Sequence, residues 1–232
     1  MANTNQTFNL PPPIGFQPFR DDLPVTWYKQ DLPHLRQDGE TYFVTFRLND
    51  SLPQSKLREL RQLREEWMHK HPPPRTFAIL DELSQEIMRR VERWLDQQMG
   101  SCILGHEKLA AEVVNALHRL DGQNHELGCF VVMPNHVHAV VRPLTSKEMS
   151  LELILRRWKG GSARDINLIR KSSGAIWQRE SFDRIIRDAE HLYRVIQYIG
   201  RNPAKAGVAA ERYRLWIRPS WIQQGWDFEK TS

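Results

Sequence analysis

The sequence predicts an α+β fold: an antiparallel sheet of four to five strands with helices packed on one face. Three observations support this prediction. Residues 41–48 are dominated by β-branched and aromatic side chains, which favour a strand. Two similar runs, 126–133 and 136–142, are separated only by Pro134-Asn135, which is typical of a tight hairpin turn. Segments with apolar residues every three or four positions, typical of amphipathic helices, surround these strands.

The segment before the first strand has no regular pattern. Residues 1–38 mix prolines with short polar stretches and show no period of 2 or 3.6, so we expect an extended arm. After the strand, residues 52–70 and 81–98 both have the pattern of charged amphipathic helices, with breaking residues after each. We interpret residues 52–100 as a helical insertion that follows the first strand.

The hairpin is flanked by two further helices and followed by another strand. Residues 106–120 carry apolar side chains on one helical face, which should cover the sheet. Residues 151–170 are predicted to be helical, with an interruption at Gly160-Gly161. Residues 175–186 carry a fourth strand signal.

The last helix begins after Asp188, which is a favourable N-cap residue. We expect this helix to run to about Asn202, where Pro203 and Gly207 end it. The complete order of strands and helices is satisfied most simply by an antiparallel sheet of ferredoxin-like type.

Length and composition indicate one globular domain. A chain of 232 residues suits one domain with appendages, so we assign residues 39–222 to a single domain and residues 223–232 to a tail. No apolar run approaches the roughly 20 residues of a membrane span, so no membrane partner is expected. The N-terminal residues lack the features of a secretory signal, which predicts a cytoplasmic location. Cys102 and Cys129 lack CxxC spacing and are expected to be reduced.

Positive charge is concentrated in the last third of the chain. Residues 151–220 hold 15 Lys and Arg against 7 Asp and Glu, a net charge of +8, whereas the rest of the chain carries −3. Tryptophan and tyrosine side chains lie among these cations, a combination that suits base stacking beside a phosphate track. This region is therefore the candidate for binding a nucleic acid, although a solvated basic surface has the same composition.

The tripeptide His136-Val137-His138 lies within a predicted strand. Successive strand residues point to opposite faces, so both imidazoles emerge on the same side. Two histidines can hold a divalent ion and leave positions open for substrate oxygens. The tripeptide alone is also compatible with two ordinary polar residues on a half-exposed strand.

Tyr198 and Asn202 are four positions apart on the last predicted helix, so they lie on one face of it. A phenol that can attack phosphorus and an amide oxygen that can complete a metal site are thus presented together. Tyr193 is a rival, because it lies about 140° away around the same helix and both hydroxyls cannot face one site. Tyr198 could instead be an interface tyrosine with a satisfied hydroxyl.

Three segments together, MPNHVHAVV, WQRESFDRIIRD and YIGRNPAKAG, resemble the REP-associated tyrosine transposases. These are single-tyrosine HUH endonucleases related to insertion-sequence transposases, and the resemblance covers about residues 41–221. It implies that His136 and His138 are the metal ligands, that Tyr198 is the nucleophile and that Asn202 is the third ligand. The long stretch between the first strand and the hairpin, and the proline-rich arm, depart from the family pattern.

The resemblance also implies an activity. The enzyme would cleave and rejoin single-stranded or hairpin DNA, such as REP-like palindromes, with Mg²⁺ or Mn²⁺ and a 5′-phosphotyrosine intermediate. No nucleotide cofactor is expected, and the chain would act as a monomer or homodimer associated with the nucleoid.

Seven cations are candidates for contacting the DNA. Four flank the Gly160-Gly161 pair, where small residues allow close approach of a phosphate, although a solvated helix face is the alternative. Two more are on the last predicted helix and one follows it, and the first of these, Arg194, could also influence the Tyr198 phenol. The full set is Arg156, Arg157, Lys159, Arg164, Arg194, Arg201 and Lys205.

Two other functions fit the same residues. One is a domesticated DNA- or RNA-binding module that has kept the fold and lost cleavage. The other is a metal-dependent hydrolase that uses the HxH site to activate water. A stable protein–DNA adduct would distinguish the transposase from both.

Overall fold

A computed structural model describes residues 8–24, 26–29, 33–144 and 149–229 of the chain. Its centre is a five-stranded sheet in the order β6-β3-β5-β4-β7, and every neighbouring pair of strands is antiparallel. The strands are β3 (Tyr42–Arg47), β4 (His125–Val132), β5 (His136–Pro143), β6 (Phe182–Ile185) and β7 (Arg214–Ile217). The α+β class and the antiparallel sheet are confirmed, and β7 is a strand that the sequence analysis does not predict.

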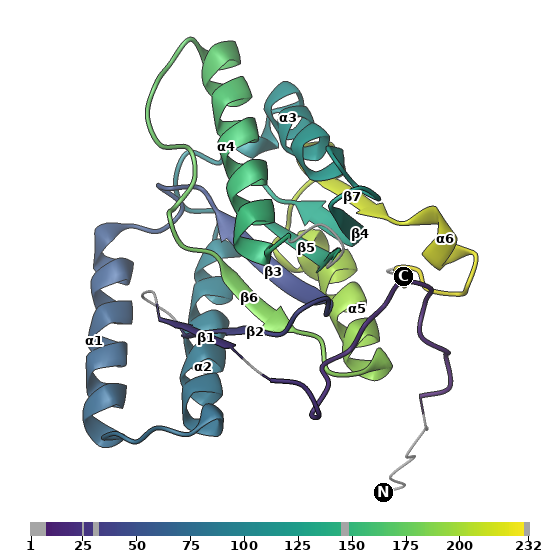
Figure 1. The fold of residues 1–232 in the computed structure, drawn as a ribbon. Helices are drawn as coiled ribbons and strands as arrows, with labels where there is room; N and C mark the ends of the chain where they lie inside the picture. Colours follow the sequence, from purple (N-terminus) through teal and green to yellow (C-terminus); the bar gives the residue numbers. More distant parts are fainter. Residues whose placement is uncertain (1–7, 25, 30–32, 145–148, 230–232) are drawn as a thin grey trace, which may run out of the picture.

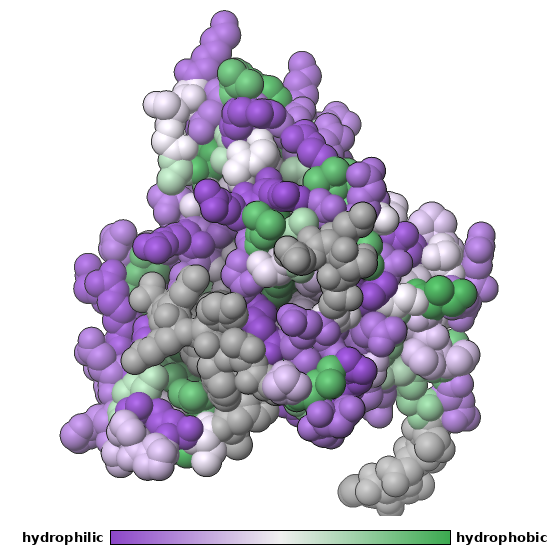
Figure 2. Space-filling view, viewed as in Figure 1, coloured by the Kyte–Doolittle hydropathy of each residue, from purple (hydrophilic) through white to green (hydrophobic). Residues whose placement is uncertain are grey.

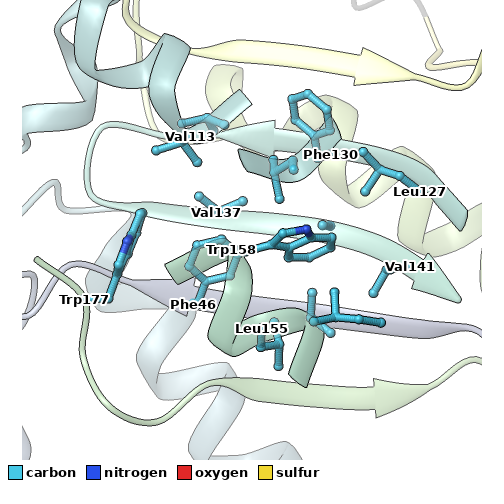
Figure 3. Close-up of a cluster of buried hydrophobic side chains, with 14 of the residues drawn as sticks. Phe46, Val113, Leu127, Phe130, Val137, Val141, Leu155, Trp158 and Trp177 are labelled. Carbon is cyan, nitrogen blue, oxygen red and sulfur yellow. The ribbon is translucent and has the colours of Figure 1, made fainter. Parts of the chain in front are cut away.

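The helices cover both faces of this sheet (Figure 1). On one face lie α3 (Glu107–His118) and α4 (Leu151–Arg170). Trp158 and Leu155 of α4 pack over Phe46 and Val137 of the sheet (Figure 3). On the other face lies α5 (Ala189–Lys205), which packs against a second apolar cluster. The expectation of helices on one face only is thus corrected. The central strands are apolar at nearly every position, so both of their faces need a covering layer.

The β4–β5 hairpin turns at Pro134-Asn135, as predicted, and the Met133 backbone N–H donates to the carbonyl of His136 at 2.8 Å. Near the other end of β4 the register shifts between Leu127 and Cys129. The residue between them is Gly128, where a Cβ atom would overlap the ring of Trp221. A glycine is required there because the indole packs directly on the backbone.

The helical insertion has the two helices that the sequence predicts, α1 (Gln54–Lys70) and α2 (Phe77–Leu95). Only α2 contributes fully buried side chains. Leu83, Ile87 and Val91 form a cluster that includes Phe182 of the edge strand β6. The insertion therefore extends the fold beside the sheet edge, and α2 lies next to the functional helix α5. A short 3₁₀ helix, η1 (Ile103–Gly105), leads from the insertion into α3.

Two predicted helix boundaries are wrong. The helix α4 runs without a break through Gly160-Gly161, because Trp158, Ser162 and Ile166 keep one continuous buried face. That packing outweighs the roughly 1 kcal/mol by which each glycine disfavours a helix. The helix α5 has the expected Asp188 cap but continues through Pro203 to Lys205. Its end coincides with Gly207, which has a positive φ of 62°.

The N-terminal segment is packed along the body of the protein. Strands β1 (Thr26–Lys29) and β2 (Pro33–Arg36), which the sequence analysis does not predict, form a separate antiparallel pair. Phe16 is buried in the cluster beneath α5, and the Trp226 indole N–H donates to the Pro11 carbonyl at 2.9 Å.

The C-terminal residues also pack on the body. They include the 3₁₀ helix η3 (Ala210–Arg212) and the short helix α6 (Pro219–Ile222). Trp226 lies in the region predicted as a tail and is fully buried. Within the described part of the chain, no helix combines the length and apolar character needed to cross a bilayer.

Candidate active site

The two histidines of the HxH motif project from the central strand β5 toward α5. Val137, Ala139 and Val141 point to the opposite face, where they join the cluster under α3 and α4. His136 and His138 are only 1% and 0% exposed, respectively. The interpretation of a half-exposed strand is therefore wrong. β5 has a neighbour on each side and α5 covers its functional face.

Each imidazole is oriented by a hydrogen bond to its Nδ1 atom. For His136 the partner is the amide oxygen of Asn135 at 2.7 Å, and for His138 it is Oγ1 of Thr45 at 2.7 Å. An amide oxygen only accepts, so Nδ1 of His136 carries the proton and its Nε2 has a free lone pair. The two Nε2 atoms converge to 3.0 Å. Both rings thus present the atom that a metal ion would use.

Burial keeps both imidazoles neutral. It lowers the pKa of His136 to about 3, against an opposing effect of the Asn202 side chain. Burial, the neighbouring His136 and the positive charge of Lys205 lower the pKa of His138 well below its ordinary value. At neutral pH both rings are in the unprotonated form that binds divalent ions.

The helix α5 presents Tyr198 and Asn202 on one face, as their spacing predicts, and brings both to the histidine pair. The Tyr198 hydroxyl lies 3.4 Å from Nε2 of His138, and the Asn202 amide donates to that hydroxyl at 3.2 Å. Asn202 is buried, and its amide oxygen has no hydrogen-bond partner of good geometry among the described residues. The rival Tyr193 points elsewhere, since its hydroxyl donates to Glu229 at 2.8 Å.

The donor set fits a divalent ion. Two ligand atoms about 2.1 Å from an octahedral ion and at right angles to each other are about 3.0 Å apart. This matches the separation of the two Nε2 atoms. The unsatisfied amide oxygen of Asn202 is available as a third donor, because a buried polar atom without a partner is costly unless a ligand satisfies it. The described residues contain no cluster of three or more His, Cys, Asp or Glu that could hold a metal, so this set depends on the amide.

Two acidic residues of the insertion also reach this site, and the sequence analysis does not predict them. Burial raises the pKa of Tyr198 far above its ordinary value, and the charges of Glu92 and Asp96 raise it further. Burial also raises the pKa of Glu92, to about 7. No local pattern marks these carboxylates, because α2 approaches α5 only in the folded chain.

A groove of about 410 Å³ is lined by residues of α2, β6 and α5, among them Tyr198. Phe43, Met88 and Val195 supply apolar walls, and Arg184 is among the cations along it. The half-buried Tyr198 side chain therefore faces this groove.

The predicted DNA-binding cations fall into two groups. Those of α4 lie on the face of the sheet opposite Tyr198, a largely hydrophilic surface in the view of Figure 2. Arg156 and Arg157 are exposed there, whereas the Lys159 ammonium is tied to the Arg179 carbonyl at 2.7 Å and Arg164 pairs with Asp165.

The cations of α5 share the helix of Tyr198, and each is ion-paired. Arg194 pairs with Glu190, Arg201 with Glu229, and Lys205 with Asp96. The Lys205 ammonium also lies 5.9 Å above the Tyr198 ring. The structure therefore brings only Lys205 of the seven candidates into contact with the tyrosine.

Comparisons with known proteins find limited similarity. No family model matches the chain. An uncharacterised protein of Haemophilus influenzae is 28% identical over 96 residues, which cover 32% of this chain and 52% of that protein. The chain thus spans about half the length of this relative. A solved structure of a REP-associated tyrosine transposase bound to a REP hairpin superposes with a TM-score of 0.37 and 16% identity, covering 75% of this chain and 72% of that chain.

Proposed function

We propose that this protein cleaves and rejoins single-stranded or hairpin DNA through Tyr198, with Mg²⁺ or Mn²⁺ held by His136, His138 and Asn202. The observation that supports this most directly is the position of the Tyr198 hydroxyl, 3.4 Å from Nε2 of His138 and one helical turn from Asn202. A phenol beside two neutral imidazoles and an unsatisfied amide oxygen suits attack on a phosphodiester.

Each residue of the site has a separate role in this proposal. His136 and His138 would hold the ion, because their Nδ1 hydrogen bonds keep both Nε2 atoms directed inward. The Asn202 N–H group orients the phenol oxygen. The Tyr198 oxygen attacks phosphorus and the bond to the 3′ oxygen breaks, which leaves a 5′-phosphotyrosine and a free 3′-OH. A bound divalent ion supplies positive charge that polarises the scissile phosphate.

No nucleotide cofactor is required in this scheme, because the phosphotyrosine bond retains the energy of the phosphodiester until the strand is rejoined. The substrate class rests on the sequence motifs around His136, Tyr198 and Asn202. The basic region of residues 151–220 supports a polyanionic ligand, since its charge is net +8.

The proposal is tested by covalent trapping. The protein is incubated with hairpin and single-stranded oligonucleotides and Mn²⁺, and the adduct is identified on a denaturing gel and by mass spectrometry. Tyr198→Phe should abolish the adduct and leave DNA affinity within a few fold, because only the attacking oxygen is lost. Tyr193→Phe is the matched control on the same helix and should form the adduct normally.

Two results would contradict this function. If wild-type protein binds DNA but forms no adduct with either ion on any strand, the chain is a binding module without cleavage. If the Tyr198→Phe variant still forms the adduct, another residue is the nucleophile.

A further inference from the structure

The Tyr198 hydroxyl must lose its single proton before or during attack, and two acceptors lie within its reach. One is Nε2 of His138 at 3.4 Å, and the other is the carboxyl of Glu92 on α2, which lines the same groove as Tyr198 and interacts with it electrostatically. The Asn202 amide only donates to the phenol oxygen, so it cannot take the proton. A divalent ion held by His138 would occupy the Nε2 lone pair of that ring, which leaves the carboxylate as the acceptor.

The surroundings of Glu92 suit proton transfer near neutral pH. The Glu92 side chain is half-buried and lines the same groove as Tyr198. Its charged neighbours are Lys205 and Arg184, which favour the carboxylate, and Asp96, which disfavours it. Burial has the largest effect and raises the pKa of Glu92 to about 7, so both protonation states are accessible at physiological pH.

The part of α2 that carries Glu92 is packed against the body of the protein. Beside Glu92, Val91 and Leu95 of α2 are fully buried. The Asn135 amide group, in the hairpin turn next to His136, donates to the Leu95 carbonyl at 3.2 Å. The same asparagine orients His136 through its oxygen. The helix that carries Glu92 is thereby connected to the histidine pair.

We propose that Glu92 is a catalytic residue of this site: the proton acceptor for Tyr198, contributed by the helical insertion. This inference rests on the proposed DNA cleavage. The Tyr198 O–H bond breaks and its proton passes to the Glu92 carboxylate, while the tyrosine oxygen bonds to phosphorus. The bond from phosphorus to the 3′ oxygen breaks, and that oxygen takes a proton from water. On rejoining, the 3′-OH gives its proton to water as its oxygen bonds to phosphorus, the bond from phosphorus to the tyrosine oxygen breaks, and that oxygen recovers its proton from Glu92.

The test compares Glu92→Gln with Glu82→Gln, an exposed glutamate on the same helix. Adduct formation is measured in single turnover with saturating protein and Mn²⁺, and Mn²⁺ affinity is measured separately by electron paramagnetic resonance. Glu92→Gln should slow adduct formation by about 100-fold or more, within the range for general base catalysis, with unchanged Mn²⁺ affinity. Glu82→Gln should match the wild type in both measurements.

A double-mutant cycle tests the contact without relying on cleavage. The urea midpoints of Glu92→Gln, Tyr198→Phe and the double variant should be non-additive if the two side chains interact. Additive midpoints, an adduct rate of Glu92→Gln within threefold of wild type, or loss of Mn²⁺ binding in that variant would each overturn the role. Failure of the wild type to form any adduct would instead overturn the proposed function itself.

Discussion

At the scale of single residues, the site combines groups whose ordinary chemistry is changed by burial. His136 and His138 are held neutral, Tyr198 is made a weaker acid, and Glu92 is made a weaker acid by the same loss of water. Such shifts stabilise uncharged forms in the metal-free protein. A cation placed among these groups would lower the pKa of Tyr198, because a positive charge favours the phenolate.

The histidine pair should make the metal-free protein sensitive to acid. Both pKa values are lowered from 6.5, to about 3 for His136, so below about pH 6.5 the unfolded chain binds protons that the folded chain does not. The contribution of the histidine pair to the free energy of unfolding should be complete above that pH and should be lost as the pH is lowered. Urea unfolding in EDTA at several values between pH 7 and pH 4 measures it.

The control is the double variant His136→Gln/His138→Gln, whose unfolding free energy should depend less steeply on pH. The pKa values of His125, which is buried, and of His191, which is half-buried, are also lowered, so the double variant keeps part of the slope. Parallel curves for the two proteins would show that the pair is not held neutral.

At the scale of elements, the site depends on α5 and on the segments that pack around it. The apolar stripe of α5 meets the sheet beneath it, and Phe16 of the N-terminal segment joins the same cluster together with Trp226. Gly200 lies against Phe228, where an added Cβ would be 2.7 Å from the ring. Described residues near both ends of the chain thus pack against the helix that carries Tyr198.

This packing predicts that the N-terminal segment contributes to stability. Phe16→Ala should lower the free energy of unfolding by about 3–5 kcal/mol, as expected for truncating a phenylalanine that is 7% exposed. Ile14→Ala, at a side chain that is 80% exposed, should change it by less than about 0.5 kcal/mol. Chemical denaturation measures both. Equal and small effects would mean that the segment is not packed on the body of the protein.

At the scale of the whole molecule, the sheet separates two surfaces. One face carries α5, the tyrosine and the histidine pair, whereas α3 and α4 lie on the other face with the exposed cations Arg156 and Arg157 (Figure 1). A DNA that contacts both surfaces must pass around an edge of the sheet.

The salt dependence of binding tests the contribution of α4. Affinity for single strands should fall with salt with a log–log slope of about −0.7 per phosphate contact. Arg156→Gln/Arg157→Gln should reduce the magnitude of that slope by up to about 1.4, if each cation meets one phosphate. Fluorescence anisotropy titrations at several KCl concentrations measure it.

The matched control is Arg58→Gln/Arg61→Gln, which removes the same charge from exposed positions on α1. Its slope should equal that of the wild type. If both double variants behave alike, the effect is one of net charge, and α4 makes no specific phosphate contact.

Features that depend on neighbouring residues were predictable from the amino-acid pattern. The strand at Tyr42, the Pro134-Asn135 turn, the shared face of His136 and His138, and the pairing of Tyr198 with Asn202 all follow from the geometry of a strand, a turn or one helical turn. The family resemblance predicted that the histidine pair and the Tyr198–Asn202 pair belong to one site. The 3.4 Å contact of Tyr198 with His138 agrees with this.

Other features required the folded chain. The second helical layer, the complete burial of the histidines, the packed N-terminal segment and the approach of Glu92 to Tyr198 join segments that are far apart in sequence. Local periodicity reports which face of an element is apolar, but it does not report which distant element covers that face. Only packing selects the partner, because burial against any apolar surface satisfies the same pattern.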